Sequence, residues 1–133
     1  FDYYNVQDGE TPEMIAHKYY GDPNLHWTIL VANDIIDYYE EWPMSTQRFE
    51  EFVFDKYENP QAVHHYEITQ TSGDTNITID VGMNTTEYPS ATAISNYQYE
   101  DKLQEKKRQI RLIGTRYISD FVKEFERKMN EAS

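Results

Sequence analysis

Apolar and polar positions along residues 1–33 predict a short strand followed by two helices. Tyr4 and Val6 alternate with polar residues, as in a strand with one buried face, and the turn dipeptide Asp8-Gly9 ends that strand. A helix is expected directly afterwards, with Thr11 as its N-cap and Pro12-Glu13 in its first turn. Its apolar side chains recur at helical spacing: Ile15, Ala16, Tyr19 and Tyr20.

Gly21 and Pro23 predict the end of this first helix. Glycine is favoured in the left-handed position after a helix, and a proline two residues later prevents its continuation. Asn24 is then expected to cap a second helix that ends near Asn33. The apolar residues of the second helix repeat every three to four positions: Trp27, Leu30 and Val31.

The middle of the chain predicts a third helix and a β-hairpin. The helix is capped by Ser45 or Thr46, ends at residues 58–60, and has the apolar stripe Phe49, Phe52, Val53 and Tyr57. From Ala62 the period changes to two, so residues 63–69 and 76–81 are expected to pair across a connection at 70–75. Because an isolated hairpin is not stable in water, this one must pack on the core or on a partner.

The last third of the chain predicts a helix, a strand and a second helix. Residues 82–98 have the composition of an extended loop, and residues 99–107 that of a polar helix. Ile110 and Leu112 alternate with polar residues over 108–113, as in a strand with one buried face. The final helix is marked by apolar residues at helical spacing: Tyr117, Ile118, Phe121, Val122, Phe125 and Met129.

Charge is distributed unevenly within the net −12. Residues 1–100 contain 18 acidic side chains against three basic ones, whereas residues 101–133 contain nine basic against six acidic. Such an acidic body repels phosphate backbones, so nucleic-acid binding is not expected. The basic end either contacts the acidic body of another molecule or lies against its own chain. Its candidate partner-contact residues are Lys106, Lys107, Arg108 and Arg111.

Composition narrows the class of protein. There is no cysteine, and no apolar run approaches the roughly 20 residues that cross a bilayer, which fits folding in a reducing cytoplasm without membrane insertion. Aromatic content is 15% although mean hydropathy is −0.86, so aromatic side chains serve half-buried core or protein contacts. We expect Trp42 to cover the helix pair and Tyr38 and Tyr39 to contact a partner; a sugar-stacking surface is the alternative.

Catalytic and metal-binding patterns are weak. His64 and His65 are adjacent on a predicted strand and should point to opposite faces, and His17 has no second ligand one helical turn away. There is no Gly-x-Ser-x-Gly elbow and no glycine-rich phosphate loop. We therefore expect no catalytic residues, no metal and no cofactor, with a muramidase-type hydrolase only as a distant alternative.

The strand and two helices resemble the lysin motif (LysM), a βααβ fold with two helices on one face of a two-stranded sheet. The residues that carry the resemblance are Val6, Gly9, Thr11, Ile15, Ala16, Tyr20, Gly21, Asp22, Pro23, Trp27 and Asn33. The form Tyr20–Trp27 with Ala32–Asp34 is similar to LysM-like segments of contractile-phage tail proteins. Cell-wall enzymes usually continue with a Pro-Gly-Gln-x-Leu segment, which residues 35–44 replace here.

The end of the chain strengthens this resemblance. Residues 106–113 followed by Tyr117-Ile118-x-x-Phe121-x-x-Glu124-Phe125 look like the C-terminal end of the LysM-like baseplate wedge subunit of T-even-type contractile-tailed phages. The resemblance implies a structural virion protein of the tail baseplate, present in each of six wedges, that joins neighbouring wedges into the ring. It implies no catalytic residues. Its expected partners are other wedge proteins and copies in neighbouring wedges.

Together these features predict an α+β fold in a single domain. Residues 1–45 form the LysM-like strand and helices, 46–106 an insertion with a helix and a hairpin, and 107–133 the closing strand and C-terminal helix. The resemblance to the βααβ fold implies that the strand at 108–113 closes the LysM-like unit and pairs with its first strand. The expected function is structural, in the virion tail baseplate, after folding and assembly in the host cytoplasm. The alternative is a peptidoglycan-binding LysM module of a tail-associated or lytic protein.

Overall fold

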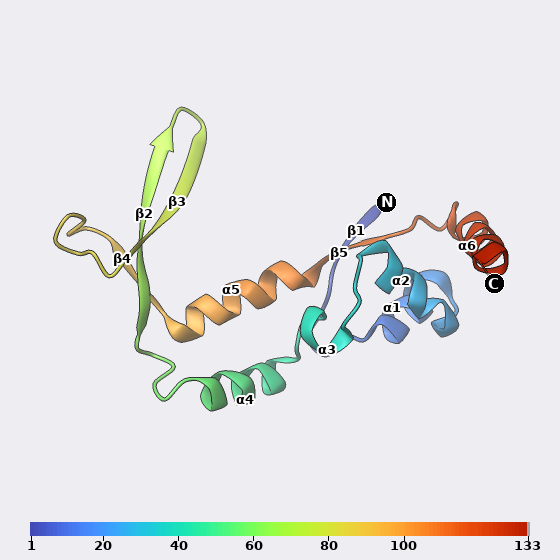
Figure 1. The fold of residues 1–133 in the computed structure, drawn as a ribbon, viewed down its shortest axis with the longest axis horizontal. Coiled ribbons are helices and arrows are strands. Elements are labelled where there is room, and N and C mark those ends of the chain that lie inside the picture. Colours follow the sequence, from blue (N-terminus) through green and yellow to red (C-terminus); the bar gives the residue numbers. More distant parts are fainter. Residues whose placement is uncertain (133) are drawn as a thin grey trace. The chain divides into compact units, whose positions relative to one another are not determined.

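The computed structural model describes residues 1–132, apart from the side chain of Ser72, and confirms the predicted α+β class. Contacts divide the chain into two compact units (Figure 1). Unit 1 contains Phe1–Thr46 together with the chain from Glu105 onward, and unit 2 contains Gln47–Gln104. In the described part of the chain, no helix has both the length and the apolar character to cross a bilayer.

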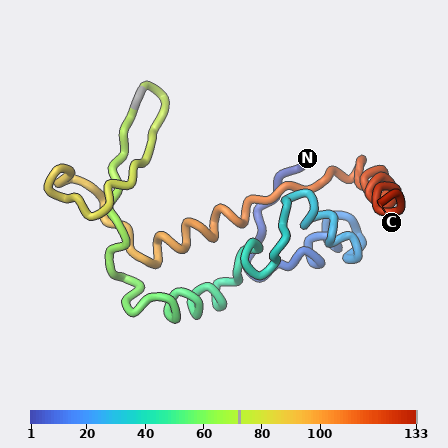
Figure 2. Tube along the Cα trace, in the orientation of Figure 1, coloured from blue at the N-terminus to red at the C-terminus, as the bar shows by residue number. Residues whose placement is uncertain are grey.

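Unit 1 is built on a two-stranded sheet made from both ends of the chain. Strand β1 (Asp2–Asn5) pairs antiparallel with β5 (Gln109–Leu112), and Tyr4 lies opposite Ile110. Figure 2 shows the N-terminal segment beside this late segment. The predicted pairing of these two segments is therefore confirmed, while the comparison with LysM stays a prediction.

Helix α1 (Pro12–Tyr20) begins and ends as its sequence predicts. The Thr11 side chain accepts a hydrogen bond from the Met14 amide at 3.2 Å, which satisfies one of the unpaired N–H groups of the first turn. Gly21 ends the helix with φ of +75°, a left-handed conformation that glycine adopts without steric cost.

The start of the second helical segment differs from the prediction. A 3₁₀ turn, η1 (Pro23–Leu25), precedes α2 (His26–Ala32). The Asp22 side chain caps η1 by accepting the Asn24 amide at 2.9 Å, so Asn24 is not the cap of α2. The helical segment therefore begins two residues earlier than predicted, because the fixed φ of Pro23 suits the first position of the turn.

A further short helix, α3 (Tyr38–Glu41), was not predicted. The Glu41 carboxylate accepts the amides of Ile36 and Asp37 at 2.6 and 2.8 Å, and the Asp37 side chain accepts the Tyr39 amide at 3.1 Å. These local carboxylate contacts hold a single helical turn, which is too short to show an apolar period.

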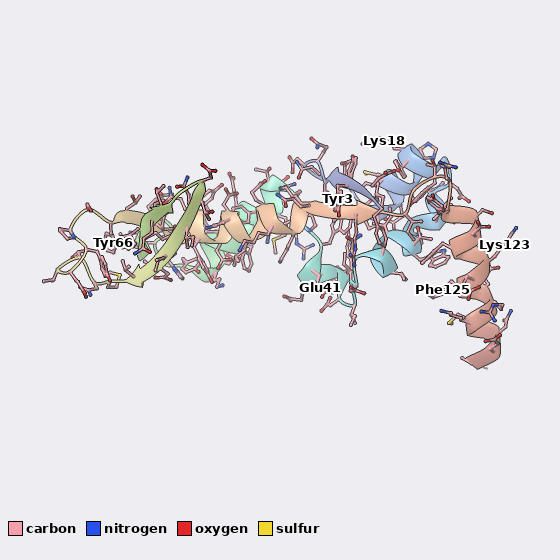
Figure 3. All side chains as sticks on the ribbon, turned by 90° about the horizontal axis from the view of Figure 1, so that it is seen from above. Tyr3, Lys18, Glu41, Tyr66, Lys123 and Phe125 are labelled. Carbon is pink, nitrogen blue, oxygen red and sulfur yellow. The ribbon has the colours of Figure 1, made fainter. Side chains whose placement is uncertain are left out.

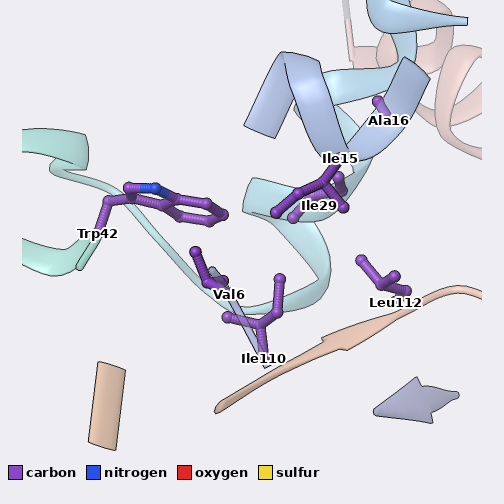
Figure 4. Close-up of a cluster of buried hydrophobic side chains, with 7 residues drawn as sticks. All are labelled: Val6, Ile15, Ala16, Ile29, Trp42, Ile110 and Leu112. Atoms are coloured by element: carbon purple, nitrogen blue, oxygen red, sulfur yellow. The ribbon is translucent and has the colours of Figure 1, made fainter. Parts of the chain in front are cut away.

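The core of unit 1 lies between the sheet and the helices (Figure 4). Its buried side chains are Val6, Ile15, Ala16, Ile29, Trp42, Ile110 and Leu112. Trp42 is 4% exposed, and its indole N–H donates to the Glu10 carbonyl oxygen at 2.9 Å. Trp42 is thus part of the core, in agreement with the prediction that it covers the helix pair.

Unit 2 contains α4 (Thr46–Lys56) and most of α5 (Asn96–Arg108). Phe49 and Val53 of α4 are buried, as the apolar stripe predicts, and the Phe49 ring meets Tyr97 edge-on at 5.3 Å. Glu100 of α5 is also buried.

The prediction of an extended loop over residues 82–98 is wrong at its C-terminal end. Residues 92–95 form a short strand, and residues 96–98 belong to the first turn of α5.

The sheet of unit 2 has the strand order β3-β2-β4, formed by β2 (Val63–Ser72), β3 (Thr75–Gly82) and β4 (Thr92–Ser95). The predicted hairpin is present, but its strands are longer than expected. Only Gly73 and Asp74 form the turn, because Gly73 adopts φ of +61°, as two-residue hairpin turns require.

His64 and His65 do not point to opposite faces as predicted. The pairing of β2 with β4 shifts between Val63 and His65, and this irregularity brings the two imidazole Nδ1 atoms to 2.8 Å. The His64 ring also stacks on Tyr99 at 3.8 Å. Among the described residues no group of three or more His, Cys, Asp or Glu side chains is arranged to hold a metal ion.

Candidate partner-contact surface

The basic segment that precedes and includes β5 lies against its own unit. Lys107 Nζ donates to the Glu40 carbonyl oxygen at 2.7 Å. Arg108 donates to the carbonyl oxygens of Val6 and Met44, at 3.4 and 3.2 Å, and its side chain is only 13% exposed. Arg108 therefore connects the end of β1 to the segment after α3.

Arg111 makes similar contacts within unit 1. Its Nε donates to the Ala32 carbonyl oxygen at 2.6 Å, and an Nη atom lies 3.5 Å from an Asp34 carboxylate oxygen. Lys106 is exposed. Of the four basic residues predicted to contact a partner, three thus bind their own chain, which favours the interpretation of the basic segment as an intramolecular support.

Tyr38 and Tyr39 occupy the unpredicted α3. The Tyr38 ring stacks on Trp42 at 5.9 Å and packs against the core. Tyr39 is 70% exposed, and its ring meets that of Tyr38 edge-on at 5.7 Å. Tyr39 consequently has the more accessible aromatic surface for a partner, and the contact role of both residues stays a prediction.

Two of the motif residues connect the helices of unit 1 to its sheet. Asn33 accepts the Arg111 amide at 2.9 Å and donates to the Arg111 carbonyl oxygen at 2.8 Å, so its side chain pairs with β5 as a strand backbone would. The Tyr20 hydroxyl donates to the Ile113 carbonyl oxygen at 2.6 Å. These contacts give Tyr20 and Asn33 a structural role.

A charged cluster supports the start of unit 1. The Glu10 carboxylate accepts hydrogen bonds from the Tyr4 hydroxyl at 2.7 Å and from Lys18 Nζ at 2.9 Å. Burial alone disfavours the ionised form of Glu10, but the hydrogen bonds from Lys18 and Tyr4 outweigh burial and lower the pKa of Glu10. The cluster connects β1 to α1.

Helix α6 (Ile118–Ala132) is the most amphipathic element of unit 1. The Phe121 ring stacks on Trp27 at 6.2 Å, and the Phe125 ring packs against Trp27 at a tilt, at 4.8 Å. Figure 3 shows Phe125 on the side of the helix that faces the rest of unit 1. None of the described residues of α6 is buried, and Tyr117 and Met129 are 62% and 59% exposed. The motif residue Trp27 therefore serves the contact with α6 and lies outside the central core.

A groove of about 580 Å³ lies beside this helix within unit 1. Its lining is mainly apolar and comes from the N-terminus, α2, β5, α6 and the segment between β5 and α6: Phe1, Val31, Arg111, Ile113, Tyr117 and Phe121. Arg111 lies over the Phe1 ring at 5.0 Å. Sequence analysis identified the apolar stripe of α6 but missed the groove, because a groove depends on how distant segments pack.

Comparisons with known proteins agree with the resemblance. A family model described as base plate wedge protein 53 matches residues 1–79, from β1 into β3. The baseplate wedge protein gp53 of Enterobacteria phage T4 is 27% identical over 144 residues, a match that covers 97% of this chain and 74% of the relative.

These matches confirm the predicted role as a structural baseplate wedge protein of a phage virion. They give no support to the alternative, a peptidoglycan-binding LysM module. The chain belongs to the base plate wedge protein 53 family.

Proposed function

We propose that this protein is a joint between proteins of the baseplate wedge, and that it acts by binding and positioning, without catalysis or a cofactor. Its partners are other wedge proteins and copies of itself in neighbouring wedges. In a closed ring each subunit uses two different surfaces, one for each neighbour. The protein works in the tail baseplate of the virion and is folded and assembled in the host cytoplasm.

The observation that carries this proposal is the incompletely covered apolar face of α6. A helix with one apolar stripe normally buries that stripe against a core. Here Phe121 and Phe125 reach Trp27, yet Tyr117 and Met129 at the two ends of the stripe remain more than half exposed. Exposed apolar side chains on one helix face, beside a groove, are typical of a protein contact.

Size-exclusion chromatography with light scattering tests whether this protein joins other wedge proteins. The chain alone and mixed with the other wedge proteins of the same phage should give different masses, with a defined larger complex only in the mixture. Replacing Tyr117 and Met129 by Gln should reduce complex formation without unfolding the protein. Lys123→Gln, on the polar side of α6, is the matched control and should assemble normally.

A second measurement addresses the wall-binding alternative. The purified chain is mixed with insoluble peptidoglycan and sedimented. A wedge joint should remain in the supernatant and still enter the complex with wedge proteins. A chain that ignores the wedge proteins and sediments with peptidoglycan would contradict the proposal.

A further inference from the structure

Strand β3 has an open edge along its whole length. In the described sheet β3 pairs only with β2, since the order is β3-β2-β4. Proteins usually block such an edge with lysine, proline or a covering element. The eight residues of β3, Thr75–Gly82, include neither lysine nor proline. The N–H and C=O groups on this edge are therefore available to another strand.

The outer part of the hairpin also lacks support from its own sheet. Strand β4 pairs with β2 only between Val63 and Glu67. Beyond Glu67, β2 and β3 form a two-stranded ribbon, with Ile68 opposite Ile79 and Thr69 opposite Thr78. A two-stranded ribbon is at best marginally stable in water, so an added third strand would stabilise it.

One face of the ribbon is apolar. Ile77 and Ile79 alternate with polar residues along β3, and Ile68 lies across from Ile79 on the same face. Ile77 is 53% exposed. A strand added beside β3 would place every second side chain on this face, so apolar residues at those positions would cover Ile77.

The opposite face of the ribbon is acidic. Glu67 and Asp80 lie directly across from each other, an arrangement that is unfavourable for like charges. His65 approaches Glu67 at 2.6 Å and Asp80 at 4.0 Å, and the Asp80 side chain is 62% exposed. Residues 57–101 contain seven Asp and Glu and no Lys or Arg. A lysine or arginine beside Asp80 must therefore come from outside this segment.

We propose that β3 binds an extended segment of another wedge protein by strand addition, and that this segment alternates apolar residues with Lys or Arg. The apolar residues cover Ile77 and the basic residues face Asp80. A second copy of β3 does not fit this description, because it would bring acidic side chains to an acidic face. The proposal rests on the proposed function, since the partner is a protein of the wedge.

The register identifies the amides that would bind the added strand. The backbones of Ser72 and Thr75 flank the two-residue turn and form a hydrogen-bonded pair. From there, hydrogen-bonded and non-hydrogen-bonded pairs alternate along the ladder. Thr69 and Thr78 consequently form a non-bonded pair, and their N–H groups point to opposite outer edges. The β3 amides of Asn76, Thr78 and Asp80 therefore face the proposed partner.

A pair of proline variants tests the proposal. Thr78→Pro removes a donor from the β3 edge and places a ring where the added strand would lie. Thr69→Pro makes the same change on the other edge, at the residue directly across the ribbon. Neither substitution removes a hydrogen bond of the hairpin ladder. Circular dichroism of both full-length variants first establishes that each is folded.

We expect Thr78→Pro to weaken incorporation into the reconstituted wedge about tenfold or more, and Thr69→Pro to leave it near the unmodified level. Hydrogen exchange of the unmodified chain should show protection of the amides at 76, 78 and 80 only in the wedge. Equal incorporation of both variants, or unprotected β3 amides in the wedge, would overturn strand addition. Failure of the unmodified chain to join any wedge complex would instead contradict the proposed function.

Discussion

The two units of this protein are stabilised by different interactions. Unit 1 has a continuous apolar core that includes Ile15, Ile29 and Leu112, each at most 1% exposed. Unit 2 buries fewer apolar side chains and places the carboxylate of Glu100 between Lys56 Nζ at 2.7 Å and the Tyr57 hydroxyl at 2.8 Å. Unit 1 thus depends on hydrophobic burial, and unit 2 depends more on charge-assisted hydrogen bonds.

This difference suits a protein that connects others. A well-packed core keeps one shape in many conditions, whereas a polar network with open sheet edges gains stability when a partner covers it. Substitutions that match one residue type in the two units can separate these contributions. Both tryptophans, Trp27 and Trp42, lie in unit 1, so their fluorescence follows that unit alone.

The largest expected difference comes from shortening an isoleucine in each unit. Ile15→Ala removes a side chain that is 0% exposed and should lower the free energy of unfolding of unit 1 by about 2–5 kcal/mol. Ile77→Ala removes one that is 53% exposed and should cost less than about 1 kcal/mol. Urea unfolding followed by tryptophan fluorescence measures the first, and hydrogen exchange measures the second. Equal losses would mean that Ile77 is buried in solution.

A glutamine in place of Glu100 should destabilise unit 2 more than unit 1. Glu100→Gln keeps the shape of the side chain but loses the charge that Lys56 and Tyr57 contact, at a cost of about 1.5–3 kcal/mol. The control is Glu105→Gln, whose carboxylate is 58% exposed beside Arg108, and its effect should be below about 1 kcal/mol. Hydrogen exchange of α4 and α5 amides distinguishes the two variants.

Acid should weaken unit 2 through the same carboxylate. Burial disfavours ionised Glu100, but hydrogen bonds from Lys56 and Tyr57 outweigh burial and lower its pKa from the ordinary value of 4.5. Because the pKa is lowered in the folded state, the stabilisation is present above pH 4.5 and is lost as the pH falls through the folded-state pKa. Protection of α4 amides should therefore fall below pH 4.5, and less steeply in Glu100→Gln. A parallel acid response in the variant would assign the loss to other groups.

The smallest difference is expected for glycines in turns. Gly21 and Gly73 have φ of +75° and +61°, and an added Cβ would meet no atom within 4 Å at either. Alanine at each position should therefore cost only the conformational strain of the left-handed region, about 1–2 kcal/mol. Gly21→Ala should shift the fluorescence transition of unit 1, whereas Gly73→Ala should change hydrogen exchange in the hairpin only. A clearly larger loss at one glycine would show that this turn directs the folding of its unit.

Elements with strong local signals were predictable from the sequence. Thr11 and Gly21 bound α1 because capping and left-handed positions have specific residue preferences. The alternation around Ile110 indicated the strand β5, and its pairing with β1 followed from the resemblance to the LysM fold. The single turn of α3 and the short β4 were missed. Their hydrogen-bond partners come from side-chain caps or from a distant strand, neither of which gives a period along the chain.

The candidate contact surface was harder to predict than the fold. The basic residues were identified by charge alone, and charge does not reveal that Arg108 reaches carbonyl oxygens of Val6 and Met44. Those acceptors are distant in sequence from Arg108, and every residue has a carbonyl oxygen. The groove beside α6 likewise forms from several segments of the chain.

The pairing of β1 with β5 has a consequence during synthesis of the protein. The ribosome makes β1 first, but its partner strand and the core residues Ile110 and Leu112 emerge only near the end of translation. The apolar faces of α1 and α2 therefore stay uncovered until almost the whole chain has been synthesised, whereas all residues of unit 2 have been synthesised earlier. A nascent or truncated chain that stops before β5 would expose these faces to aggregation or to chaperones.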